Sequence, residues 1–441
     1  MKNKIKLVLL FTISFLVTKA QEIKKMSLKE AVEIAISKSN EAILADLKIE
    51  TAQLEYATIK NNLYPNLRLT GQYLRLNEPI LDGALLGSST SSNQKPDVNS
   101  LLLAQANFTM PLFQGFRLKN NVSVSEDFLK SQIYATAHSK EQIALRVTEL
   151  FARLYQANQT QKLFEDNLKV AKQREKDFSN AVDNGLLAKN DLLKAQLQSS
   201  TIQLGLDNAI KNATIINYQL ITIMQFSENT IIDIDIETVK RETAASQLQN
   251  FDGQRGDLEA LSLQQKAANT AIKIAKSNYY PTINLVGGYI ALDLKNALRV
   301  TNAMNAGIGV SYDVTSLFKN DKNVKLAESK AKQNQQAATI LSEKIKEEIK
   351  EADENYKLSM KQNKVFSEAV VQSSENNRII KDKYDNGLST TNDLLEADVQ
   401  QLNAKINLAL SQADLALRYY QVQFAAGKLI KSFNLNSNTK Q

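Results

Sequence analysis

Proline limits what this chain can fold into, because its five copies leave two very long stretches without one. They are Pro65, Pro79, Pro96, Pro111 and Pro281. None lies in 112–280 or in 282–441. Proline removes a backbone hydrogen-bond donor, and its ring clashes with the preceding turn inside a helix. The two proline-free stretches therefore permit helices of unusual length.

Each proline-free stretch begins with a predicted long helix, the first at 117–182 and the second at 320–384. Along both, mostly apolar side chains recur at alternating spacings of three and four residues. This pattern is typical of helices that pack at a shallow angle, as in coiled coils. At 1.5 Å per residue each helix would be roughly 100 Å long. That length exceeds a compact domain of this size, so the helices are expected to form a rod or a tube.

A nearly identical turn follows each predicted long helix. "DNGLLAKNDLLKAQLQ" begins at Asp183 and "DNGLSTTNDLLEADVQ" begins at Asp385, and the two match at 10 of 16 positions. A tight turn between antiparallel helices favours a glycine with positive φ, which Gly185 and Gly387 supply. We therefore predict one helical hairpin in each half of the chain. The predicted turns are 183–190 and 385–391.

Shorter helices are expected to flank these elements. They are predicted at 27–61, 190–226, 254–278 and 392–427. Two short helices placed end to end span about the length of one long helix, so each half can form a continuous helix packed against a line of two. The order of short helix, middle segment, long helix, turn and short helix occurs twice. This order predicts two tandem structural repeats.

The middle segments have the pattern of β-strands. "NLYPNLRLTGQY" at 62–73 and "NYYPTINLVGGY" at 278–289 form a second repeated pair. Beyond each proline the apolar side chains alternate with polar or small ones, as at Ala306, Ile308 and Val310. We predict β-hairpins at about 65–113 and 281–316. Such strands are typical of transmembrane barrels but also of soluble antiparallel sheets, and the long polar connection at 78–100 favours the membrane.

Four strands are too few to close a barrel, since about eight are the practical minimum. Open sheet edges are not tolerated in lipid, because their backbone groups would lack hydrogen-bond partners. If these strands span a membrane, the chain must therefore oligomerise. Two copies would give eight strands, three twelve and four sixteen, and the residues do not choose among these numbers.

The N-terminus has the pattern of a secretory signal peptide over residues 1–20. Basic residues precede an apolar run at 7–17, and Ala20 suits the cleavage site. This segment contains four lysines and no acids, so its removal lowers the formal charge from +7 to about +3. The remaining charges are interspersed along the chain, which argues against a nucleic-acid partner.

The chain has no cysteine and one histidine, His138. It can therefore form neither disulfide bonds nor thiolate metal sites. A single histidine also leaves no basis for a histidine-rich metal site or a histidine-dependent catalytic triad. We therefore expect neither an enzyme nor a bound cofactor.

With these features the chain resembles the TolC-type outer-membrane efflux proteins of Gram-negative bacteria. The resemblance covers about 27–428 and rests on the tandem halves, the Tyr-Pro start of each first strand, "PLFQG" at 111–115 and the two "NGL" turns. It implies a mixed α and β fold in which three chains form a twelve-stranded barrel in the outer membrane and an α-helical barrel across the periplasm. The implied segments are a first repeat at 21–250 ending in an equatorial segment at 227–250, a second repeat at 251–430, and a polar C-terminal tail at 431–441.

The resemblance also implies the function, which is that of a passive exit duct in a tripartite efflux or type I secretion system. The implied partners are two further copies of the chain, outer-membrane lipid, a periplasmic adaptor and an inner-membrane transporter. The adaptor would dock on the turns, at Gly185, Leu186, Gly387 and Leu388. The alternative is a periplasmic coiled-coil adaptor or structural protein whose hairpins never enter a membrane. The sequence does not indicate the transported substrate.

Asp393 and Glu396 match the acidic pair that forms the pore gate in this family. The residues alone offer a second interpretation, since their spacing is also that of a capping box at a helix N-terminus. Asp191 and Tyr384 match two members of the family's lock between the hairpins. Ser389 occupies the position of the third member, an arginine, so the resemblance implies a looser or differently built closure.

Overall fold

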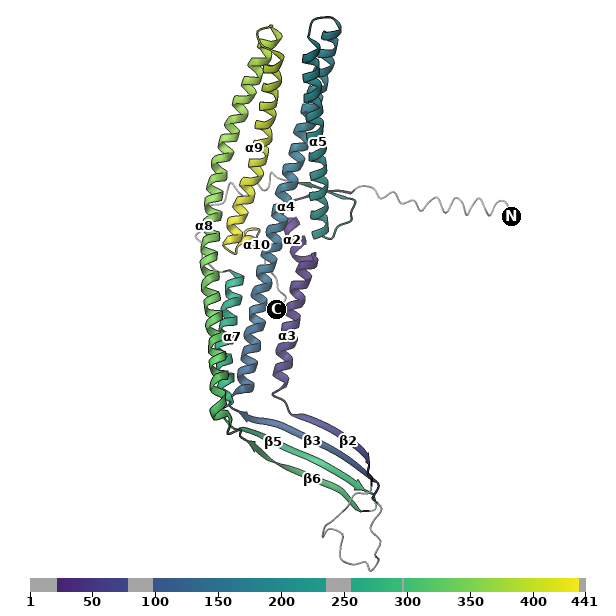
Figure 1. Ribbon diagram of the computed structural model, residues 1–441, viewed down its shortest axis with the longest axis vertical. Coiled ribbons are helices and arrows are strands. Elements are labelled where there is room, and N and C mark those ends of the chain that lie inside the picture. The colour runs from purple at the N-terminus through teal and green to yellow at the C-terminus, as the bar shows by residue number, and fades with distance from the viewer. Residues whose placement is uncertain (1–21, 78–97, 235–254, 296, 436–441) are drawn as a thin grey trace, which may run out of the picture. The chain divides into compact units, whose positions relative to one another are not determined.

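The computed structural model describes residues 22–77, 98–234, 255–295 and 297–435 (Figure 1). The chain divides into two compact units, and each unit draws on both halves of the sequence. The first, here called the hairpin unit, comprises Met1–Leu47, Ala135–Asp257 and Ser342–Gln441. The second, the sheet unit, comprises Lys48–Tyr134 and Leu258–Leu341. The predicted signal peptide at 1–20 and most of the 78–100 connection lie outside the described residues.

The two halves contain similar series of elements. The first half has β1 (Glu22–Met26), α2 (Leu28–Lys38), α3 (Asn40–Asn61), β2 (Asn66–Arg75), β3 (Ser100–Gln114), α4 (Arg117–Asp183), α5 (Lys189–Ile223) and β4 (Thr230–Ile234). The second half has α7 (Gly256–Ser277), β5 (Thr282–Leu294), β6 (Leu298–Ser311), α8 (Ser316–Asp385), α9 (Thr391–Ala425) and α10 (Leu429–Ser432). The helices α4 and α8 have 67 and 70 residues, as the absence of proline allows.

The helix predicted at 27–61 is in fact two helices, because the helical conformation is interrupted at Ser39. This residue has extended backbone angles (φ −64°, ψ 147°) and is buried. Its hydroxyl accepts the N–H of Ala42 at 3.1 Å, so it caps the first turn of α3. Serine competes for backbone hydrogen bonds in this way at helix ends, and the competition ends α2 after Lys38.

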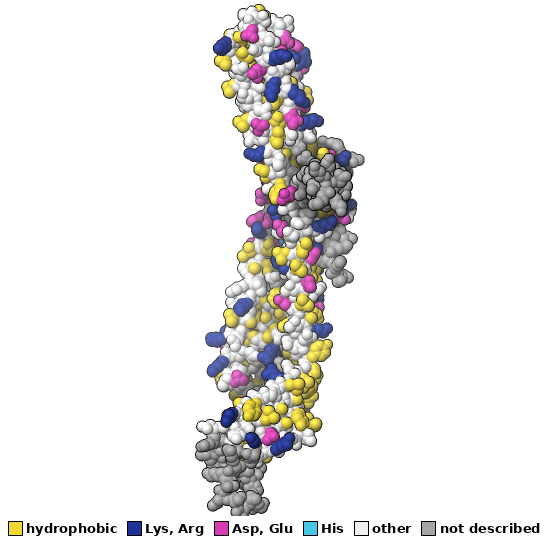
Figure 2. All heavy atoms as spheres, turned by 90° about the vertical axis from the view of Figure 1, so that its right-hand side faces the viewer, with side chains coloured by type: hydrophobic (Ala, Val, Ile, Leu, Met, Phe, Trp, Pro, Cys, Tyr) yellow, Lys and Arg dark blue, Asp and Glu magenta, His cyan; other side chains and the backbone are white. Residues whose placement is uncertain are grey.

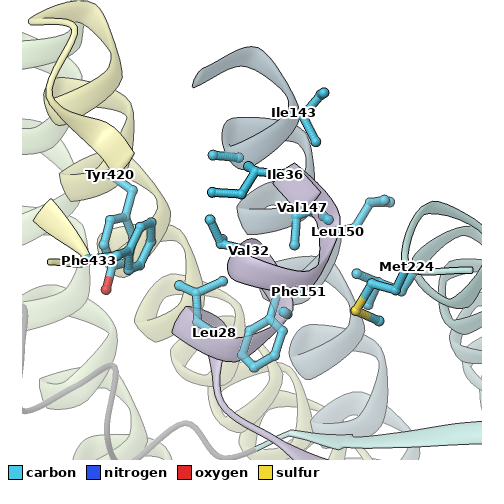
Figure 3. Packing of buried hydrophobic residues seen from close by; sticks show 14 of the residues in the cluster. Leu28, Val32, Ile36, Ile143, Val147, Leu150, Phe151, Met224, Tyr420 and Phe433 are labelled. Atoms are coloured by element: carbon cyan, nitrogen blue, oxygen red, sulfur yellow. The ribbon is translucent and has the colours of Figure 1, made fainter. Parts of the chain in front are cut away.

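The main core lies in the hairpin unit and joins segments far apart in the sequence (Figure 3). Leu28, Val32 and Ile36 of α2 face Val147 and Phe151 of α4. Beside them the strands β1 and β4 pair in parallel from Glu22↔Thr230 to Met26↔Ile234, an element that the sequence patterns do not reveal. Of the predicted equatorial segment at 227–250, residues 235–250 lie outside the described part of the chain.

The C-terminal end of the described chain is packed, which corrects the prediction of a polar tail from residue 431. Leu429 and Ile430 are buried in the main core, and so is Phe433. The ring of Phe433 stacks on Tyr420 of α9, with 4.9 Å between centroids. The sequence does not predict this helix, because α10 has only four residues and a helical pattern of apolar side chains needs a longer stretch. Residues 436–441 lie outside the described part.

Glu141 of α4 fixes the start of α10. Its two carboxylate oxygens accept the backbone N–H of Ile430 at 3.1 and 3.3 Å. Burial raises the pKa of Glu141 to about 7, although the backbone N–H groups of Ile430 and Leu429 act in the opposite direction.

We expect the hairpin unit to lose stability as pH rises from about 4.5 to about 7. The folded state holds the Glu141 proton more tightly than the unfolded chain, whose ordinary pKa is 4.5. The stabilisation is therefore complete below about pH 4.5 and is lost as pH rises through 7, by on the order of 3 kcal/mol. Glu141→Gln keeps an acceptor for α10 but cannot ionise. Thermal unfolding followed by circular dichroism across this pH range should show a smaller decline for the variant; equal declines would contradict the assignment.

The sheet unit contains a four-stranded antiparallel sheet in the order β2-β3-β5-β6. The register aligns one row across the strands, formed by Leu69, Ala106, Tyr289 and Met304. The next row is formed by Arg68, Asn107, Gly288 and Asn305. Successive residues of a strand point to opposite faces. One face of the sheet is therefore mainly apolar, and the other carries mostly polar or small residues.

Both outer strands of this sheet have an open edge within the described part of the chain. All ten residues of β2 are exposed. On β6 the apolar side chains of Met304, Ile308 and Val310 are 80%, 68% and 67% exposed. The apolar face and the open edges thus occur together. Among the helices of the described segments, none has an apolar stretch long enough to cross a membrane.

Candidate functional site

The two helical hairpins end in the same turn, here called the two tips (residues 183–190 and 385–391). Gly185 and Gly387 both have φ of +74°, as the sequence predicts. In the first tip Leu186 N–H donates to Ala181 C=O at 2.8 Å, and in the second Leu388 N–H donates to the carbonyl of residue 383 at 2.8 Å. These bonds close the last helical turn in the manner of a Schellman motif. No atom lies within 4 Å of a Cβ placed on either glycine, so the backbone angle alone requires glycine.

The leucine after each glycine points into solvent. Leu186 is 81% exposed and Leu388 is 78% exposed. In many Schellman motifs this residue packs back on its own helix. Here neither leucine does so, and each tip therefore presents an apolar side chain that is free to contact another protein.

Asp393 is the third residue of α9 and forms a capping box with Thr390. Its carboxylate accepts the backbone N–H of Thr390 at 2.9 Å and the Thr390 hydroxyl at 2.7 Å, while its own N–H donates to that hydroxyl at 3.2 Å. The N-cap is thus Thr390, which corrects the alternative capping box from Asp393 to Glu396. The N–H and hydroxyl of Thr390, together with the Ser389 hydroxyl, lower the pKa of Asp393, so it stays ionised.

Glu396 lies one turn further along α9 and is exposed. Its nearest polar contact is Gln400, whose amide donates to the carboxylate at 3.2 Å. Asp393 and Glu396 therefore lie on one helix face, three residues apart, with both carboxylates accessible to solvent. Asp393 therefore caps the start of α9, and Glu396 remains exposed on the same helix face.

The two predicted lock residues are not joined to each other within one chain. Asp191 pairs with Lys194 at 3.6 Å. The Tyr384 hydroxyl lies 3.5 Å from Thr391 Oγ1 in its own hairpin. The Tyr384 ring instead reaches the first hairpin by stacking on Phe178, with 6.1 Å between centroids and 29° between planes. Tyr384 thus links the hairpins through its ring.

A second link between the hairpins was not apparent in the sequence. The guanidinium of Arg174 in α4 forms an ion pair with Asp398 in α9, and both side chains are mostly buried, at 15% and 16% exposed. Asn377 of α8 also donates to the Asp398 carboxylate, at 2.8 Å. Below this pair Leu402 of α9 packs in a cluster with α4 and α5. The sequence carries no signal for this pairing, because its members lie on three helices.

Residues that could hold a metal ion do not gather in this region. Nowhere in the described ranges do three or more His, Cys, Asp or Glu side chains form such a group. The arrangement offers instead two apolar tips, two ionised or ionisable acids and two cross-hairpin links.

Known proteins are similar to this chain in sequence and in fold. Residues 248–428 match the family model of the outer membrane efflux protein. Outer membrane protein TolC of Vibrio cholerae serotype O1 is 23% identical over 359 residues, which cover 77% of this chain and 79% of TolC. Residues 248–428 are therefore similar to the outer membrane efflux proteins.

Solved channels share the fold of this chain. The outer membrane protein VceC from Vibrio cholerae matches with a TM-score of 0.74 and 16% identity, over 93% of this chain and 97% of VceC. The CmeC outer membrane channel of Campylobacter jejuni matches with a TM-score of 0.76 and 16% identity, over 93% of this chain and 90% of CmeC. The open state of the Neisseria gonorrhoeae MtrE channel matches with a TM-score of 0.71 and 16% identity, over 91% of this chain and 88% of MtrE. At these identities the likeness is one of fold.

The ring of Tyr384 should matter more to closure of the hairpins than its hydroxyl. Tyr384→Phe removes the 3.5 Å contact with Thr391, which is at the limit of a hydrogen bond, and keeps the stack on Phe178. Tyr384→Ala removes both, and aromatic pairs contribute about 0.5–1.5 kcal/mol beyond their buried area. We expect a small rise in the uptake of large antibiotics for Tyr384→Phe and a larger one for Tyr384→Ala. Equal uptake by wild type and both variants would contradict a role for this contact in closure.

Proposed function

We propose that this efflux-family chain forms the outer-membrane channel of a tripartite efflux or type I secretion system. Three copies form one passive exit duct across the outer membrane and periplasm. The observation that carries the proposal is the sheet with one apolar face and two open edges, in a chain whose residues 248–428 match the family model of the outer membrane efflux protein. The duct itself performs no chemistry, and its substrates are selected by the transporter that feeds it.

The sheet supports assembly into a barrel with other copies. In a closed barrel, β2 of one copy would pair with β6 of the next, and no unpaired backbone group would face lipid. The apolar face, which includes the row of Leu69 and Met304, would contact the membrane, and the polar face would line the duct. Three copies of four strands give twelve; the family resemblance supports the number three.

The hairpin unit has apolar side chains that its own chain leaves uncovered. On α5 these are Leu193, Leu197, Leu204, Ile215 and Tyr218, each at least half exposed. On α8, Leu358, Val365 and Ile379 recur at multiples of seven residues and are also exposed. Such spacing is typical of a helix with an unfilled seam. Packing α5 of one copy against α8 of the next would cover both seams.

The surface charges of the hairpin unit support a helical assembly in water. On the face shown in Figure 2, acidic and basic side chains are interspersed along its helices. The acids Asp393 and Glu396 of three copies would place six carboxylates around a narrow pore.

Leu186 and Leu388, with the adjacent glycines, would dock the periplasmic adaptor. The two hairpins and their shared turn support a tandem repeat of one ancestral half.

The first test is the mass of the mature protein extracted from membranes, measured by light scattering with correction for detergent. A trimer recovered from the outer-membrane fraction is expected. A soluble monomer or dimer in the periplasm would contradict the proposal and favour the coiled-coil adaptor. Deletion of the gene should also raise drug susceptibility or block secretion, and the full chain should restore the phenotype.

A further inference from the structure

We propose that a cavity in the sheet unit, lined by Arg117 and Lys319, binds the anionic group of a transported solute, a carboxylate or a phosphate. The inference rests on the proposed function, since it concerns what passes through the duct. It adds a site of opposite charge to the acids of α9. The cavity has a volume of about 400 Å³ and lies where three strands meet two long helices.

The register places this cavity on the polar side of the sheet. Gln114, Thr282 and Ser311 line it and form one row across β3, β5 and β6. The neighbouring row has Phe113, Ile283 and Val310, which are apolar and point to the other face. In the proposed barrel, the cavity therefore opens to the duct rather than to lipid.

Neither cation of the cavity is held in an ion pair by an acid of the described segments. Arg117 donates to the amide oxygen of Gln114 at 3.3 Å, a neutral acceptor. Among the described residues no carboxylate lies within 4.0 Å of Arg117 or Lys319. On the same helix as Lys319, by contrast, Lys325 pairs with Asp321 at 3.0 Å. Positive charge is thus left available in the cavity.

One acid, Asp313, also lines the cavity, but its carboxylate is bound locally. One of its oxygens accepts the hydroxyl of Thr315 at 2.5 Å and the backbone N–H of Thr315 at 3.0 Å. These bonds, with smaller contributions from the Ser316 N–H and the Lys319 charge, lower the pKa of Asp313. Two cations face one engaged carboxylate, so the cavity retains a net positive charge.

Asparagines form a fixed floor beneath the cations. Asn320 is 2% exposed, and its amide donates to Ala275 C=O at 2.7 Å. Its own oxygen accepts from Asn278 at 3.4 Å and from Asn323 at 3.2 Å. Because the floor is already hydrogen-bonded, Arg117 and Lys319 are the groups left to bind a ligand. A guanidinium matches the planar fork of a carboxylate or the edge of a phosphate.

A site in a passive duct must release its ligand as readily as it binds it. Two solvent-accessible cations provide such weak attraction, since water and salt screen their charges. Three copies would place six cations around the duct. The site would therefore draw anionic solutes onward without trapping them.

The test is titration of the purified full-length protein in detergent with inorganic phosphate, followed by phosphorus NMR. Arg117→Gln with Lys319→Gln should weaken phosphate binding at least fivefold. The control is Lys322→Gln with Lys325→Gln, which removes two positive charges as well. Both lysines are exposed on α8, the helix of Lys319, but lie outside the cavity, so phosphate binding should be unchanged. Equal losses in the two double variants, or no binding by the wild type, would overturn the inference.

Two further measurements distinguish a solute site in the duct from a lipid site. Monomeric short-chain phosphatidylglycerol binding more tightly than phosphate would assign the cavity to lipid and overturn the solute assignment. In planar bilayers under a potassium chloride gradient, the Arg117 and Lys319 double variant should shift the reversal potential toward cation selectivity, and the control should not. A protein that binds phosphate at this site but forms no conducting channel would refute the proposed function instead.

Discussion

Replacing Asp398 by alanine is expected to destabilise the hairpin unit by about 3–5 kcal/mol, because the change leaves a buried guanidinium without its counter-charge. The Arg174 side chain is 15% exposed, so water can compensate only a small part of its charge. Asn377 would lose its acceptor at the same time. Thermal or denaturant unfolding of the purified protein measures the loss directly.

Two controls separate the buried pair from a general effect of mutation. Glu375→Ala removes one member of an exposed ion pair with Arg378 and should change stability little. The double variant Arg174→Met with Asp398→Leu replaces both charges by apolar groups and should recover most of the loss. If Asp398→Ala is no more harmful than Glu375→Ala, the pair does not hold the hairpins together.

Replacing both tip leucines, Leu186 and Leu388, by aspartate is expected to abolish efflux or secretion while leaving assembly intact. The two side chains are 81% and 78% exposed, so the folded chain loses almost no packing. The partner surface, however, would lose two apolar contacts and have to bury two charges. Drug susceptibility should rise to that of the gene deletion, and the detergent-extracted trimer should keep its mass.

The matched control is the double variant Leu186→Met with Leu388→Met, which keeps an apolar side chain of similar volume at each tip. It should retain most of the activity. Crosslinking of the tips to the adaptor should follow the same order as activity. Full efflux by the aspartate variant would contradict adaptor docking at these positions.

The elements that follow local rules could be predicted from the sequence. The long helices at 117–183 and 316–385 exist because no proline interrupts them, and the tips form where Gly185 and Gly387 permit positive φ. The strands follow from period-two alternation after Pro65 and Pro281. In each case the signal is contained within a few neighbouring residues.

What could not be predicted depends on partners distant in the sequence. Ser39 breaks a helix only because its hydroxyl caps α3 there. The segment after Gly427 folds back because Glu141, nearly 290 positions earlier, accepts its N–H groups. The Arg174 and Asp398 pair needs the register between two hairpins. No pattern of residue spacing within one helix predicts such a contact.

The open edges of the four-stranded sheet have a genetic consequence. If insertion requires β2 of each copy to pair with β6 of the next, folding in the membrane and assembly are one event. A single defective copy then prevents the whole ring from closing. With equal expression of a normal allele and an edge-defective allele, random mixing would leave about one ring in eight free of defective subunits. Edge mutations should therefore be dominant over the wild type, whereas mutations that unfold the chain before assembly should be recessive.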